Sequence, residues 1–164
     1  MDEEELMEKA EAVARERGCT IGERLGSGIH GIVIVLESES KAAMTALKVL
    51  WSAKPYRRER ETYERLMEAR VTKVRGFNVP QLLWWDDELL ALEMTVVAPP
   101  FVLDFAGAYL DFAPDFSPEA WEDWSRKNEE QFGADWPEAL AILAELEEFG
   151  IRMLDPSPSN IRFR

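Results

Sequence analysis

Three closely spaced glycines, Gly26, Gly28 and Gly31, are the feature that most restricts how this chain can fold. Residues 20–25 before them and residues 32–36 after them are rich in β-branched and aliphatic side chains, which predicts a strand on each side of a tight turn. Because no helix follows the turn, the spacing does not fit a dinucleotide-binding motif. Such a glycine hairpin can lie flat over phosphate groups, since glycine lets backbone N–H groups approach an anion. The plainer alternative is a hairpin whose glycines only make the turn.

A strand and a helix are predicted after the hairpin, and each carries one charged residue of interest. Residues 43–50 form the strand, which contains Lys48, and Pro55 suits the first turn of a helix that runs to about residue 69. On this helix, spacings of 3, 4 and 3 place four residues on one face: Tyr56, Glu59, Tyr63 and Leu66. A carboxylate among apolar residues is costly unless it is paired. Glu59 is therefore expected to pair, either with Lys48 or with an arginine on its own helix.

These elements resemble the protein-kinase-like family, in which a glycine loop ending in G-x-V precedes a V-A-x-K strand. Residues 31–33 and 45–48 fill those places, with Thr45 where valine is usual. The resemblance implies that Glu59 holds Lys48, and that Lys48 contacts the phosphates of ATP. The short interval between them is more similar to compact, atypical members of the family. The resemblance also implies a set of nucleotide-binding residues: Gly26, Ser27, Gly28, Gly31, Val33, Ala46 and Lys48.

Residues 81–85 and 89–94 are predicted to form two further strands joined by three acidic residues. In the kinase resemblance the second of these is the last strand before the hinge. Leu92 would then line the back of the nucleotide site as the gatekeeper. The carbonyl of Glu93 and the N–H of Thr95 would meet the adenine edge. The alternative is an ordinary hairpin, and on these residues alone the two interpretations remain open.

Asp155 and Asn160 form a second motif, because they stand at D-x-x-x-x-N spacing directly after a predicted helix and a short apolar run. The spacing resembles the kinase catalytic loop, which implies that Asp155 orients or accepts the proton of an attacking hydroxyl and that Asn160 binds Mg²⁺. Alone, the segment is equally typical of turns, since Asp-Pro and Ser-Pro pairs favour them. Its place after the glycine loop, Lys48 and Glu59, in the family's order, argues against coincidence.

The chain also departs from the family pattern. Met153 and Leu154 stand where His-Arg is usual, and Ser157 stands where a lysine would stabilise the transferred phosphoryl group. No Asp-Phe-Gly follows Asn160 before the sequence ends at Arg164. The sequence therefore predicts the loss of one metal ligand and one cation, which together would lower the rate by several orders of magnitude.

The domain organisation is predicted from a change at Ala98-Pro99-Pro100, where strands give way to helices. We expect an α+β, protein-kinase-like fold: an N-terminal helix over residues 1–19, an antiparallel β-rich lobe with one packed helix over 20–98, and a shortened helical lobe over 99–164. Ser117-Pro118 should begin one of its helices. Asp135 and Glu138 should form a capping box at the start of the next. The apolar stretch 101–112 should pack under this lobe or form a partner surface.

Charge and cysteine content exclude several classes of function. The formal net charge is −13, from 19 Lys+Arg against 32 Asp+Glu, so nucleic acid and anionic membranes are not expected as partners. The single cysteine allows no disulfide within the chain. The sequence opens without a signal peptide and has no apolar run of membrane-spanning length, so a cytoplasmic location is expected.

Two functional hypotheses follow. The first is an ATP- and Mg²⁺-binding phosphotransferase of reduced form, with Lys48, Glu59 and Asp155 as catalytic residues and Asn160 as a metal ligand. The second is a catalytically inactive, pseudokinase-like module that binds and regulates a protein partner. A partner or a second copy of the chain that supplied the missing ligand would reconcile the two.

Overall fold

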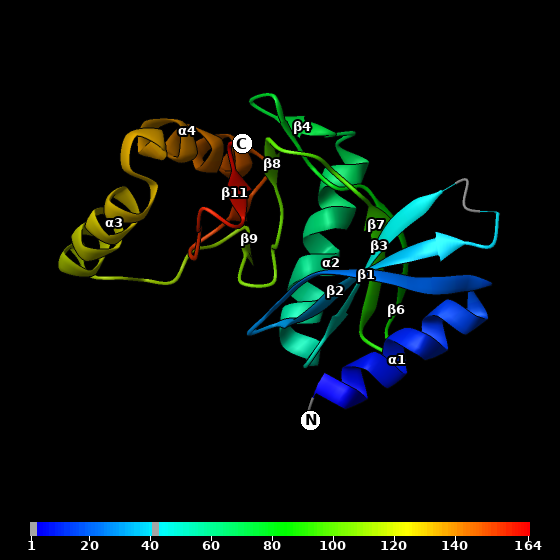
Figure 1. The fold of residues 1–164 in the computed structure, drawn as a ribbon. Helices are drawn as coiled ribbons and strands as arrows, with labels where there is room; N and C mark the ends of the chain where they lie inside the picture. The colour runs from blue at the N-terminus through cyan, green and yellow to red at the C-terminus, as the bar shows by residue number, and fades with distance from the viewer. Residues whose placement is uncertain (1–2, 41–42) are drawn as a thin grey trace.

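The computed structural model describes residues 3–40 and 43–164, which form a mixed α+β structure with largely antiparallel sheets, as predicted (Figure 1). The helices are α1 (Glu3–Glu16), α2 (Ala53–Glu68), α3 (Pro118–Phe132), the short 3-10 helix η1 (Gly133–Asp135) and α4 (Trp136–Glu148). The strands are β1 (Cys19–Gly28), β2 (Gly31–Ser38), β3 (Met44–Leu50), β4 (Lys73–Val74), β5 (Phe77–Asn78), β6 (Leu82–Asp86), β7 (Ala91–Thr95), β8 (Phe101–Val102), β9 (Tyr109–Leu110), β10 (Ile151–Arg152) and β11 (Ile161–Arg162). None of the helices in this described part of the chain is both long and apolar enough to cross a lipid bilayer.

The largest sheet has the strand order β1-β2-β3-β7-β6, and all neighbouring strands are antiparallel. The predicted glycine hairpin is present, with Gly28 paired to Gly31 across the turn. In the central strand, Lys48 lies opposite Val33 on one side and Leu92 on the other. The sheet therefore brings the end of the glycine hairpin and Lys48 onto adjacent strands.

Helices α1 and α2 cover opposite faces of this sheet. Successive side chains of a strand point to opposite faces, and β3 divides accordingly: Ala46 and Leu50 belong to the core cluster that contains α2, whereas Leu47 and Val49 belong to the cluster that contains α1. Since β3 is buried on both faces, its side chains are almost continuously apolar. Lys48 is the one charged residue of β3, and it lies on the α2 face.

Two small sheets connect the β-rich part to the rest of the chain. In one, the order is β11-β8-β5-β4, and in the other β9 pairs with β10. Both strands that flank residues 103–108 are thus paired with strands that flank residues 153–160: β8 with β11 and β9 with β10, each antiparallel. These pairings hold two segments that are about fifty residues apart in the chain side by side.

The helix cap predicted for α3 is present, whereas the one predicted for α4 is not. Ser117 caps α3 as predicted, because its hydroxyl accepts a hydrogen bond from the Ala120 N–H at 3.2 Å. The predicted capping box of α4 is wrong: Asp135 has helical backbone angles within η1 and its side chain makes no cap. Glu138 instead accepts a hydrogen bond from Arg75 Nε at 2.8 Å. A tertiary ion pair between Arg75 and Glu138 has replaced the predicted capping hydrogen bonds.

Glycine is required at position 31 of the hairpin. Its φ is +158°, and a Cβ at this position would overlap the Val49 carbonyl oxygen of β3. We expect Gly31→Ala to lower the free energy of unfolding by about 1–3 kcal/mol, because β2 and β3 would have to move apart. Gly28→Ala is the matched control, since nothing lies within 4 Å of a Cβ there. Urea denaturation of the two variants measures the difference, and equal losses would contradict the prediction.

Candidate functional site

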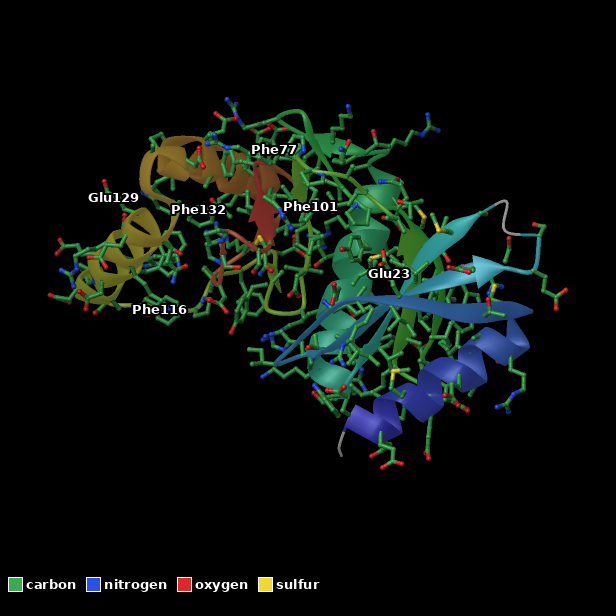
Figure 2. All side chains as sticks on the ribbon, in the orientation of Figure 1. Glu23, Phe77, Phe101, Phe116, Glu129 and Phe132 are labelled. Atoms are coloured by element: carbon green, nitrogen blue, oxygen red, sulfur yellow. The ribbon has the colours of Figure 1, made fainter. Side chains whose placement is uncertain are left out.

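A cleft of about 780 Å³ lies between the main sheet and the C-terminal part of the chain. The glycine hairpin, β3 and α2 line one side, and residues of the segments 101–107 and 153–162 line the other. Figure 2 shows Phe101, one of the lining residues, between the β-rich part and the helices α3 and α4. Most predicted site residues line this one cleft: Gly26, Ser27, Gly28, Gly31, Val33, Ala46, Lys48, Glu59, Thr95, Asp155 and Asn160.

Lys48 forms the centre of the charged network in the cleft. Its Nζ lies 2.7 Å from Glu59 Oε2 and 2.9 Å from Asp104 Oδ1. Helix α2 supplies Glu59 from the face predicted by the helical spacing, where it is 1% exposed. The predicted pair of Lys48 and Glu59 is therefore present. The alternative prediction, in which Glu59 pairs with an arginine of its own helix, is wrong.

Burial and charge act on these groups in opposite directions. Burial alone lowers the pKa of the Lys48 ammonium, but attraction to Glu59 and Asp104 outweighs it and raises that pKa above its usual value. Burial raises the pKa of Asp104, but the adjacent Lys48 outweighs it and lowers that pKa. For Glu59 burial prevails and raises the pKa, with Lys48 opposing it. Two carboxylates share one ammonium, so the network carries a net negative charge when all three groups are ionised and attracts a further cation.

Asp104 is the residue that the sequence analysis missed. It follows β8, and its φ of +66° is uncommon for a residue other than glycine. The next residue, Phe105, is fully buried, and its ring packs edge-on against Tyr63 with centroids 5.2 Å apart. A signal was present: Asp104-Phe105 followed by Gly107 is similar to Asp-Phe-Gly. It stands before Asp155 in the chain, whereas the family pattern places it after.

Asp155 and Asn160 lie on a loop that several hydrogen bonds hold in place. The Trp124 Nε1–H of α3 donates to the Leu154 carbonyl at 2.7 Å, directly before Asp155. The Asn160 N–H donates to the Ser157 carbonyl at 2.9 Å, so the segment does form a turn. The Leu103 N–H donates to the Asn160 carbonyl at 2.9 Å. This last bond places Asp104 and Asn160 at neighbouring positions along the cleft.

Three residues predicted to meet a nucleotide base do not have the expected geometry. Leu92 is fully buried in the core, and Glu93 is 5% exposed, with its carboxylate bound to Thr45 Oγ1 at 2.8 Å. Neither lines the cleft. Thr95 does, but its N–H donates to the Gln81 carbonyl at 3.0 Å. The Thr95 N–H is therefore already engaged within the chain, because β7 runs to Thr95, one residue beyond the predicted end. The roles predicted for Leu92 and for the Glu93 carbonyl stay predictions.

The residues that line the cleft at this point are shifted by two along the chain. Met94, which pairs with Ala46, lines the cleft together with Val96 and Val97. The correct register depends on where β7 leaves the sheet, and residues 89–94 carry no turn signal that marks this point.

The donor set of the cleft suits only some metal ions. No cluster of three or more His, Cys, Asp or Glu side chains is found in residues 3–40 and 43–164. Asp104 and Asn160 instead offer one carboxylate and one amide oxygen. Mg²⁺ commonly takes one or two carboxylates and completes its shell with water and substrate phosphates. The residues present therefore fit a magnesium ion that binds together with a phosphate ligand.

No family model, curated protein or solved structure matches this chain. The geometry of the cleft and the chemistry of the residues that line it are therefore the observations from which a function can be inferred.

Proposed function

We propose that the cleft binds ATP with Mg²⁺ and that the chain is a compact phosphotransferase of the protein-kinase-like type. The observation that carries the proposal is the charged network below the glycine hairpin: Lys48 pairs with Glu59 of α2 and with Asp104, while Asp155 and Asn160 line the same cleft. In protein kinases the corresponding parts are a lysine held by a helix glutamate, the Asp-Phe-Gly aspartate, and the aspartate and asparagine of the catalytic loop.

The proposal revises the expectation that the metal-binding aspartate is absent. Asp104-Phe105-Ala106-Gly107 would take the place of Asp-Phe-Gly, although it precedes the loop of Asp155. The strands β8 and β9 that flank Asp104 pair with β11 and β10 that flank the loop. Because these pairings do not depend on which segment comes first, a kinase-like site can be assembled from segments in exchanged order.

Each charged residue has a role in this proposal. Lys48, oriented by Glu59, would neutralise the phosphates, and Asp104 and Asn160 would hold Mg²⁺, which supplies further charge stabilisation. Asp155 is exposed at the cleft, where it would orient an attacking hydroxyl and accept its proton. The base would lie against Met94, and its edge would meet the backbone at residues 95–97 rather than at Glu93.

A second candidate is a binding module without catalytic activity. It is favoured by two exposed aromatic residues in the segment between β9 and α3: Phe112 is 61% exposed and Phe116 is 43% exposed. Such side chains suit contact with a protein partner or a second copy of the chain. Ser157 in place of a lysine points in the same direction. A monomer at micromolar concentration in light scattering would remove the second copy from consideration.

Thermal unfolding with ATP, with and without Mg²⁺, tests the nucleotide proposal. A ligand that binds only the folded state stabilises it by about 2.7 kcal/mol at one hundred times its Kd. For a chain of this size that corresponds to a rise in Tm of about 5–10 °C. We expect such a rise with MgATP, a smaller one with ATP alone and none with Mg²⁺ alone. An unchanged Tm at millimolar MgATP would overturn the proposal.

A further inference from the structure

Tyr63 of α2 has a buried hydroxyl that the proposed function leaves unused. The residue lies one helical turn after Glu59, lines the cleft and is only 1% exposed. Its hydroxyl has no hydrogen-bond partner within the described residues. A buried polar group without a partner destabilises the folded state. Phenylalanine would pack against Phe105 equally well without that cost, so the hydroxyl calls for a reason other than packing.

The surroundings of the Tyr63 hydroxyl show what it could bind. The hydroxyl is a phenol, which is neutral at physiological pH and has one proton to donate, and the charges of Glu59 and Asp104 act on it. The Asp104 N–H approaches the phenol oxygen without forming a hydrogen bond of full geometry. The oxygen therefore faces the backbone of Asp104, and the O–H lies close to two carboxylates with no acceptor engaged.

We propose that Tyr63 is a positioning residue whose hydroxyl donates to the Asp104 carboxylate when that carboxylate binds a divalent cation. The inference rests on the proposed function, and it adds a residue that acts through Asp104. Without a cation, Asp104 Oδ1 is bound to Lys48 at 2.9 Å. Asp104 and Asn160 would hold the cation together, and Lys48 would then remain with Glu59 and be available to the phosphates.

The carboxylate would then keep only the Ala106 N–H, which donates to Asp104 Oδ1 at 3.5 Å, to hold its orientation. Carboxylates that bind metals are themselves hydrogen-bonded, and loss of such an outer partner typically lowers metal affinity by about 10–100-fold. Tyr63 can supply this bond because its ring is fixed by the edge-on contact with Phe105, the residue next to Asp104. The unsatisfied hydroxyl of the ligand-free protein thus becomes satisfied in the metal-bound one.

Tyr63→Phe tests this inference by removing only the hydroxyl. At a fixed, saturating ATP concentration, we expect the Mg²⁺ concentration that gives half of the full thermal shift to rise by about 10-fold or more. In the absence of ligand, the Tm should stay the same or rise, because an unpaired buried group has been removed. Tyr56→Phe is the matched control: Tyr56 is equally buried on α2, but its hydroxyl donates to Asp87 Oδ1 at 2.7 Å. That variant should lose Tm without ligand and keep the wild-type Mg²⁺ midpoint.

The outcomes separate this inference from the proposed function. If wild-type protein shows the MgATP shift and Tyr63→Phe has a Mg²⁺ midpoint within twofold of it, the role of Tyr63 is overturned and the nucleotide proposal stands. A loss of ligand-free Tm in Tyr63→Phe as large as in Tyr56→Phe would also overturn it, because the hydroxyl would then already be bonded. If the wild-type protein shows no MgATP shift, both proposals fail together.

Discussion

Replacing Lys48 with methionine is expected to lower the free energy of unfolding by about 3–5 kcal/mol at neutral pH, the usual cost of removing one partner from a buried ion pair. The substitution leaves Glu59, 1% exposed, and Asp104 facing each other without a cation. The same change should abolish the thermal shift with MgATP, since the phosphates lose their nearest cation. Lys54→Met on the exposed start of α2 is the control and should change stability by less than about 0.5 kcal/mol.

The stability lost in the Lys48→Met variant should depend on pH. Burial already raises the pKa of Glu59 in the folded protein, and loss of Lys48 raises it further. A carboxyl group whose pKa is higher in the folded than in the unfolded state destabilises the fold most when it is ionised. The difference between wild type and variant should therefore be largest above the folded pKa of Glu59 and shrink as the pH falls through it. Urea denaturation across acidic and neutral pH measures this, and a pH-independent difference would contradict it.

Asp104→Asn is expected to have the opposite balance of effects, with little change in stability and a large loss of metal dependence. Lys48 and Glu59 remain as a neutral pair, and the asparagine oxygen can still accept from Lys48. A metal ligand should matter more than its outer partners, whose loss lowers affinity by about 10–100-fold. We therefore expect the Mg²⁺ concentration for half of the ATP-induced thermal shift to rise by more than about 100-fold.

Thermal unfolding with a Mg²⁺ titration at fixed ATP checks the Asp104→Asn prediction. Asp115→Asn is the matched control, because Asp115 is exposed in the segment before α3 and lies outside the cleft. The control should keep the wild-type midpoint. A wild-type midpoint in Asp104→Asn would show that Asp104 serves only as a partner of Lys48. Asp104 would then not have the metal-binding role of the Asp-Phe-Gly aspartate.

The sequence predicted the parts of the site that depend on local periodicity. Glycines at 26, 28 and 31 between two apolar runs indicate a hairpin because strands and turns are encoded by neighbouring residues. The face of α2 that carries Glu59 follows from helical spacing alone. These patterns left Lys48 and an arginine of α2 as possible partners of Glu59, the kinase resemblance implied Lys48, and the structure contains that pair.

Other features depended on contacts that no local pattern encodes. The register of β7 moved the lining of the cleft from Leu92 to Met94. An ion pair with Arg75 took Glu138 away from the start of α4. In both places a tertiary contact decided between local arrangements that the sequence permits equally.

Asp104 shows most clearly which part of the site local sequence patterns cannot predict. The sequence by itself determined a glycine hairpin, a lysine strand and a helix with a buried glutamate, because each arises from residues within one or two turns or strands of each other. Only the tertiary structure decided that Asp104, 56 residues after Lys48, is the second partner of its ammonium. The pairing of β8 with β11 and of β9 with β10 brings that aspartate to the loop of Asp155. Strand pairing is set by the whole fold and not by chain order, so a search for the motif after Asn160 could not find it.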